Sequence, residues 1–312
     1  MIPGACRVTA VSDDSCMAHE DTRSGNSGPD ESARHHRPLT GRLPIVVEAL
    51  NSATEGIRQA VAASVAPAVR IPWPRMTGLA QALAPLQSVL QGLDEMMPDN
   101  WQGQGLRYSA MVPVMQEGFP LAWVPPASVI RELLAADGTQ ARAEVLERCR
   151  VEILASCRTA LSGVGDSSFA AQTALLEECV RMAEHGMFGG AQALAANVWD
   201  TFLRGLVRAN PDWLNGRGHW PGYRKVLTKL PAMDDEATIG QFRDAAPFLP
   251  FTAVLREFWG GNAVPLYFNR HATAHGAGAV QYTPANAVTA IMLAVSVLRE
   301  IDDCGYQVRI NA

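Results

Sequence analysis

Apolar residues recur at steps of three and four along most of this chain, and this spacing constrains the fold more than any other feature. One apolar stripe, over residues 167–185, consists of Phe169, Leu176, Cys179, Val180 and Ala183. A second, over residues 190–208, consists of Ala191, Leu194, Val198, Phe202 and Leu206. The short turn HGMFGG joins them, which predicts an antiparallel helix pair. No segment of any length has the two-residue period of a strand, so we predict an all-α helical bundle.

Proline, glycine and capping residues divide this helical pattern into segments. An amphipathic helix begins near residue 43 and ends before IPWP at 71–74, where two prolines prevent its continuation. Thr283 and Pro284 are the residue types favoured at the N-cap and first turn of the last helix, which is expected to end near residue 302. The other predicted helices cover 77–96, 127–135, 139–161, 223–229, 235–245, 250–259 and 266–275, with an irregular connection at 97–126.

Three parts follow from these segments. Residues 1–42 are polar and poor in aliphatic side chains, and we expect a disordered tail there. Residues 43–162 form an N-terminal helical region of unknown role. The glycine-rich break GVGD at 163–166 marks a domain boundary, and residues 163–312 form a C-terminal helical domain.

The composition of the chain limits the classes of function that it can have. Hydrophobic residues make up 48% of the 312 residues, which is enough for a sizeable core, and the net charge of -5 argues against coating nucleic acid through bulk charge. The six cysteines have no CxxC spacing, which is typical of free thiols in a reducing cytoplasm. No signal peptide is recognisable, and the longest apolar run, 287–298, is too short to cross a bilayer. We therefore expect a cytoplasmic protein without a membrane partner.

The stretch FNRHATAHG, residues 268–276, gathers the side chains best suited to chemistry. Arg270 and His275 are five residues apart, so they stand about 140° apart around a helix, whereas His271 and His275 share a face. An arginine fork matches a phosphate, and an imidazole moves protons near neutral pH. Together they suit RNA cleavage without a metal, in which a histidine takes the ribose 2′-hydroxyl proton.

Two other interpretations of this stretch stay open. The spacing of the two histidines in HATAH is also that of metal ligands on a helix. However, Ala272 stands where a zinc protease has glutamate, and no third ligand is near in sequence, so we expect no metal and no cofactor. Alternatively, Arg270 is a surface residue and His275 only caps the helix.

An aromatic and basic stretch follows the predicted helix pair. Within residues 213–229, side chains that can stack on bases alternate with cations that can follow phosphates. We assign RNA binding to Arg217, Trp220, Arg224 and Lys225. A solvated loop anchored by tryptophans is the alternative. The helix pair also carries Glu177, Glu178 and Asp200, any of which could pair with Arg270 across the bundle.

The segment NRHATAHG, placed between two helices after an antiparallel helix pair, resembles the motif of the HEPN domain family. That motif is an arginine, a polar residue, a few variable residues and then a histidine (Rx4-6H), and the resemblance covers roughly residues 167–305. It implies an α-helical, metal-independent endoribonuclease, often a toxin or antiphage defence effector, that works on RNA as a homodimer. Matched by position, Arg270 would bind phosphate and His275 would be the general base or acid. His271 would orient the phosphate or His275, and Asn269 would support these residues.

The resemblance also leaves an alternative. Many HEPN domains have lost catalysis and serve as dimerisation or binding modules. In both cases, a protein partner or an antitoxin is expected to bind through the N-terminal region.

Overall fold

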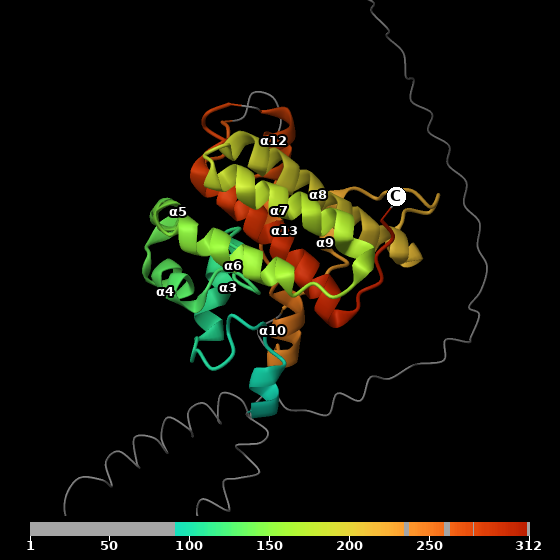
Figure 1. Ribbon diagram of the computed structural model, residues 1–312. Helices are drawn as coiled ribbons and strands as arrows, with labels where there is room; N and C mark the ends of the chain where they lie inside the picture. Colours follow the sequence, from blue (N-terminus) through green and yellow to red (C-terminus); the bar gives the residue numbers. More distant parts are fainter. Residues whose placement is uncertain (1–90, 234–236, 259–262, 277, 311–312) are drawn as a thin grey trace, which may run out of the picture. The chain divides into compact units, whose positions relative to one another are not determined.

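The computed structural model describes residues 91–233, 237–258, 263–276 and 278–310, and all of its regular elements are helices (Figure 1). The predicted tail at 1–42 and the predicted helix that begins near residue 43 lie outside the described residues. The helices are α3 (Tyr108–Gln116), α4 (Ala127–Ala135), α5 (Gly138–Arg148), α6 (Arg150–Ser162), α7 (Ala170–Glu184), α8 (Phe188–Ala209), α9 (Tyr223–Leu227), α10 (Ile239–Ala245), α11 (Phe251–Val254), α12 (Arg270–His275) and α13 (Pro284–Cys304). Two 3-10 turns, Ser167–Phe169 and Pro211–Trp213, precede α7 and follow α8. The all-α prediction is confirmed for these residues.

Helix α13 is the centre of the bundle. Every residue from 285 to 301 is buried, as expected for a helix that is apolar on all sides. It packs against α5, α6, α7 and α8, and Figure 1 shows it beside the α7–α8 pair. Its start is the predicted one, because the side chain of Thr283 accepts a hydrogen bond from the backbone N–H of Asn286, and Pro284 occupies the first turn.

The same helix has the length and composition of a membrane span. It is the one such helix in the part of the chain that the structure describes, and 94% of its apolar window is buried inside the bundle. A core helix of a soluble protein meets the same criteria, and the burial of α13 is that of a core helix. The cytoplasmic location stays a prediction.

The predicted boundary at residue 163 does not separate two cores. Buried residues from both sides of it, from Met97 to Ile301, belong to one hydrophobic core. Helices α5 and α6 pack on α13, and the indole N–H of Trp123 donates to the buried carboxylate of Glu300 at 3.0 Å. Residues 91–162 therefore form part of the same bundle as the C-terminal residues rather than a separate region.

Several predicted helices are shorter or divided. The one predicted for 223–229 ends at Leu227, and within the one predicted for 235–245, α10 begins only at Ile239. Residues 139–161 form α5 and α6 with a break at Cys149, because α5 packs on α4 whereas α6 packs on α7. Over the described residues 250–258, the helix predicted for 250–259 is reduced to α11, and beyond its end the carbonyl of Arg256 accepts from the Asn269 side chain. The helix predicted from residue 266 begins only at Arg270, because the backbone of Asn269 is extended.

The described cysteines are free thiols, as predicted: Cys149, Cys157, Cys179 and Cys304. Burial raises the pKa of Cys157 and of Cys179 to about 12. These two side chains therefore pack as small hydrophobic groups rather than as reactive thiolates.

Gly205, inside α8, provides the space for the C-terminal segment. Its carbonyl accepts from the backbone N–H of Arg309 at 3.1 Å, and a Cβ there would collide with Val308 and lie 3.3 Å from the Arg309 carbonyl. We expect Gly205→Ala to lower the free energy of unfolding by about 1–3 kcal/mol despite the better helix propensity of alanine. Urea unfolding measures this. Gly189→Ala, in the same helix with its nearest neighbour at 3.7 Å, is the control and should be neutral or stabilising.

Candidate active site

Asn269 fixes where the motif helix starts. Its side-chain oxygen accepts from the backbone N–H of Ala272 at 2.8 Å, and its side-chain nitrogen donates to the carbonyl of Arg256 at 2.8 Å. Its own backbone N–H donates to Gln281 at 3.0 Å. The residue is fully buried. Asn269 is thus the N-cap of α12, and its buried side chain fixes the start of the motif helix rather than facing a substrate.

Arg270, the first residue of α12, is directed at α8 across the bundle. Its Nη2 lies 3.5 Å from a carboxylate oxygen of Asp200 and 3.5 Å from the side-chain oxygen of Asn197. Asp200 is therefore the acidic residue of the helix pair that meets Arg270. Both contacts are at the long limit of a hydrogen bond, and the enclosed Nε of Arg270 has no partner among the described residues. The guanidinium is therefore held in place, but its N–H groups make no close hydrogen bond to any described residue.

Asp200 organises the groups around Arg270. Its carboxylate accepts from Arg204 Nε at 2.8 Å and from the Tyr223 hydroxyl at 2.7 Å. Burial and the neighbouring Asp200 raise the pKa of Tyr223, so this hydroxyl stays protonated and donates. Two guanidinium groups thus share the carboxylate of Asp200, and the carboxylate of Glu257 also acts on the adjacent His271. The guanidinium groups of Arg270 and Arg204 are suited to binding an anion such as a phosphate.

The two histidines of α12 lie in different surroundings. His271 is half-buried and packs edge-on against the ring of Tyr223, with 5.3 Å between ring centroids. Burial lowers the pKa of His271 below its ordinary value of 6.5, and the positive charges of Arg270 and His275 lower it further. His271 is therefore neutral at pH 7. His275, at the end of the helix, is exposed and makes no hydrogen bond or ion pair to any described residue.

The lowered pKa of His271 gives a direct prediction. By NMR titration of the histidine ring signals, His271 should titrate below 6.5, and Arg270→Gln should raise its pKa because a positive charge is removed. Because His271 is harder to protonate in the folded chain than in the unfolded chain, it makes the free energy of unfolding depend on pH. Its contribution to stability is fully present above pH 6.5 and is lost as the pH falls through the folded-state pKa. A His271 pKa at or above 6.5 in the native protein would contradict this description of the site.

The predicted RNA-binding stretch lies beside the motif helix. Tyr223 at the start of α9 contacts both His271 and Trp220, with ring centroids 5.3 Å apart in each pair. Arg217, Arg224 and Lys225 are exposed. The stretch and α12 are thus neighbours in space although more than forty residues separate them in the sequence.

Trp220 differs from the other three predicted RNA-binding residues. It is half-buried, and the guanidinium of Arg204 lies over its ring at 4.4 Å. One face of this indole is therefore occupied by a cation, and Trp220 anchors the loop to α8. This is the role that the alternative of a loop anchored by tryptophans predicts for it.

Asn197 and Arg204 also belong to this cluster but are not among the predicted site residues. With Asp200 they stand at steps of three and four, so all three share one face of α8, and this spacing was the available signal. Among the described residues, no group of three His, Cys, Asp or Glu side chains is placed to hold a metal ion. Comparisons with protein-family models, with curated proteins and with solved structures found no match.

Proposed function

We propose that this protein is a metal-independent endoribonuclease of the HEPN type, which cleaves RNA by attack of a ribose 2′-hydroxyl on the adjacent phosphate. The observation that carries the proposal is the state of Arg270. Its guanidinium is positioned by Asp200, yet its contacts are long and its Nε has no hydrogen-bond partner among the described residues. A phosphate oxygen is the group that would complete them.

The proposed chemistry assigns a role to each side chain. One imidazole takes the 2′-hydroxyl proton while the 2′-oxygen forms a bond to phosphorus. The bond to the 5′-oxygen breaks, and an imidazolium gives that oxygen a proton. The exposed His275 is the base or acid, the neutral His271 orients the phosphate or His275, and Arg270 stabilises the charge that develops on the phosphorane. A cyclic 2′,3′-phosphate is the first product.

A homodimer is part of this proposal. Within one chain Arg270 is directed at α8, whereas His275 is exposed at the other end of α12. Two copies related by a twofold axis would bring two such helices to one phosphate. A role as a toxin or antiphage defence effector follows from the family resemblance alone, and a cytoplasmic location and an antitoxin or other protein partner are further parts of the proposal.

A second candidate is a HEPN-like dimerisation or binding module without catalysis. The observation that favours it is that Arg270 already has a carboxylate partner and is only 15% exposed. In this case Asp200, Arg204 and Tyr223 would form a structural network, and the exposed His275 would have no role.

Incubating the purified full chain with single-stranded RNA in EDTA separates the two candidates. The proposal requires cleavage by the wild type and a loss of about 100- to 10,000-fold in His275→Ala. His185→Ala removes an equally exposed histidine at the end of α7 and should leave the rate unchanged. Equal cleavage by the wild type and His275→Ala would indicate a contaminating nuclease, and cleavage by neither would favour the binding module. Cleavage restored only by zinc would favour a metal site at HATAH.

A further inference from the structure

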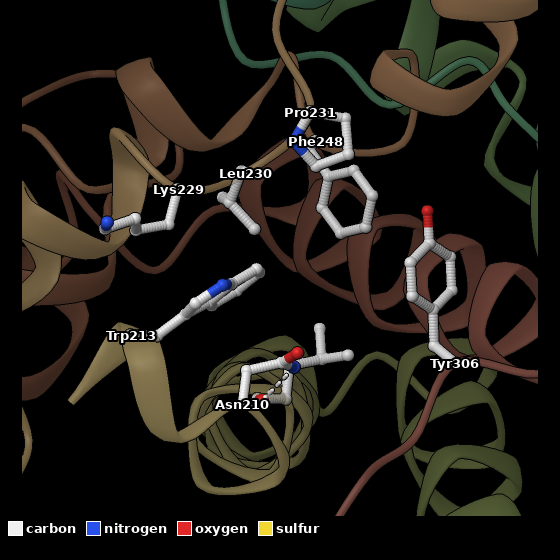
Figure 2. A pocket seen from close by; sticks show the side chains of 8 residues that line it. Asn210, Trp213, Lys229, Leu230, Pro231, Phe248 and Tyr306 are labelled. Atoms are coloured by element: carbon white, nitrogen blue, oxygen red, sulfur yellow. Dashed lines mark hydrogen bonds between the residues drawn. The ribbon is translucent and has the colours of Figure 1, made fainter. Parts of the chain in front are cut away.

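A cavity of about 270 Å³ opens at the C-terminal end of α8, apart from the cluster around Arg270. Figure 2 shows the ring of Trp213 on one side of the opening and the rings of Phe248 and Tyr306 on the other. Leu206 and Leu230 add buried aliphatic surface. Aromatic rings therefore stand on opposite sides of the cavity, and such a lining is suited to a flat apolar ring.

Two polar groups face this aromatic space. The side-chain nitrogen of Asn210 donates to the carbonyl of Leu206 at 2.8 Å, which leaves its side-chain oxygen directed into the opening (Figure 2). The indole N–H of Trp213 donates to no described residue. The residues that line the cavity thus include an acceptor at Asn210 and a donor at Trp213. The edge of a nucleobase carries the complementary groups.

The size of the cavity limits what can enter. A volume of about 270 Å³ is slightly below the roughly 300–1,000 Å³ of pockets that hold drug-sized ligands. One heteroaromatic ring system fits, but a larger ligand would have to extend into solvent. Lys229 lies at the rim with its ammonium group pointing away from the centre, where it would meet a backbone phosphate rather than a base (Figure 2).

Helix α9 connects this cavity to the motif helix. At its start Tyr223 contacts His271, and two residues after its end Lys229 lines the cavity. Arg224 and Lys225, between these two points, are exposed. Along α8, the ten residues from Asp200 to Asn210 correspond to roughly 15 Å. Exposed cations thus lie along the chain between the two sites, whose separation is one that a few nucleotides could span.

We propose that the cavity binds one base of single-stranded RNA, a few nucleotides from the phosphate at Arg270, with the sugar–phosphate backbone crossing α9. The ligand class rests on the proposed function. The base would stack on Trp213 and exchange hydrogen bonds with Asn210. This base site would give the protein a sequence or position preference that the cluster at α12 alone does not provide.

The test measures binding rather than cleavage. The full chain carrying His275→Ala is titrated with a fluorescein-labelled single-stranded RNA and with a series in which each position in turn lacks its base. We expect one position at which loss of the base weakens binding, and we expect Trp213→Ala to weaken binding of the complete RNA by about 5- to 150-fold. At that one position the losses of affinity from the missing base and from Trp213→Ala should not add, because both changes remove the same contact. Trp213→Phe keeps a ring and should retain most of the affinity.

The outcomes separate this inference from the proposed nuclease. Three results would overturn the base site, even if the wild type cleaves RNA. In the first, the affinity losses from Trp213→Ala and from a missing base add at every position. In the second, every missing base has the same small effect on binding, and in the third the protein does not bind RNA. Non-additivity at one position in a chain whose wild type cleaves nothing would support the base site and contradict the nuclease. Thermal unfolding of Trp213→Ala and Trp213→Phe shows whether each variant is folded. If Trp213→Ala is misfolded, the RNA affinities of Trp213→Phe and Asn210→Ala, compared with that of the chain with the unchanged cavity, decide the test.

Discussion

Replacing Glu300 by alanine is expected to lower the free energy of unfolding by about 3–5 kcal/mol. The carboxylate of Glu300 is fully buried, pairs with Arg243 and accepts from the indole N–H of Trp123. Burial raises the pKa of this carboxyl, and the guanidinium of Arg243 opposes the rise. Its removal would leave a buried guanidinium and a buried indole N–H without this partner.

The second partner of Arg243 provides the matched control. Asp303 also pairs with Arg243, at 2.9 Å, but its side chain is 44% exposed. Asp303→Asn should therefore cost less than about 1 kcal/mol in the same urea unfolding experiment. If Glu300→Ala cost no more than Asp303→Asn, the buried contacts of Glu300 with Arg243 and Trp123 would not contribute to stability as described.

The largest expected effect on activity is at Arg270. If the proposed nuclease is correct, Arg270→Ala should slow RNA cleavage by about 100- to 1,000-fold, the usual loss when one group that stabilises transition-state charge is removed. Arg270→Lys should recover little of the rate, because an ammonium group keeps the charge but not the planar fork. Single-turnover cleavage with saturating protein measures the rate separately from RNA binding.

An arginine outside the cluster controls for charge alone. Arg148 on α5 forms an exposed ion pair with Glu132, so Arg148→Ala removes the same charge at a site without a proposed role. Its cleavage rate should equal that of the wild type. An equal rate in Arg270→Ala and the wild type would favour the binding module, in which Arg270 only pairs with Asp200.

Local signals explain which parts of the fold were predictable. Helix α4 has the predicted ends, and α8 and α13 begin and end within about two residues of the predicted positions. Apolar periodicity lies within each segment, and α13 also has the N-cap Thr283. The break at Cys149 has no glycine or proline to signal it, since it arises from the different packing partners of α5 and α6.

Contacts between distant segments explain most of what was missed. The bond between Trp123 and Glu300 joins residues 177 apart, so nothing in the sequence near GVGD excluded a domain boundary. The pairing of Arg270 with the helix pair was anticipated, but the contacts of Arg204 and Tyr223 with Asp200 were not. Asn269 is different, because an asparagine directly before a helix is a preferred N-cap and that local signal was present.

The most direct test of the account is the chemistry of the RNA ends that the purified full chain produces in EDTA. The account predicts a 2′,3′-cyclic phosphate and a 5′-hydroxyl, and no cleavage when the single nucleotide before the cut carries 2′-deoxyribose, because the attacking hydroxyl is then absent. Cleavage that persists at the 2′-deoxy position, or that leaves a 5′-phosphate, would contradict the assignment of Arg270, His271 and His275 to metal-independent transesterification.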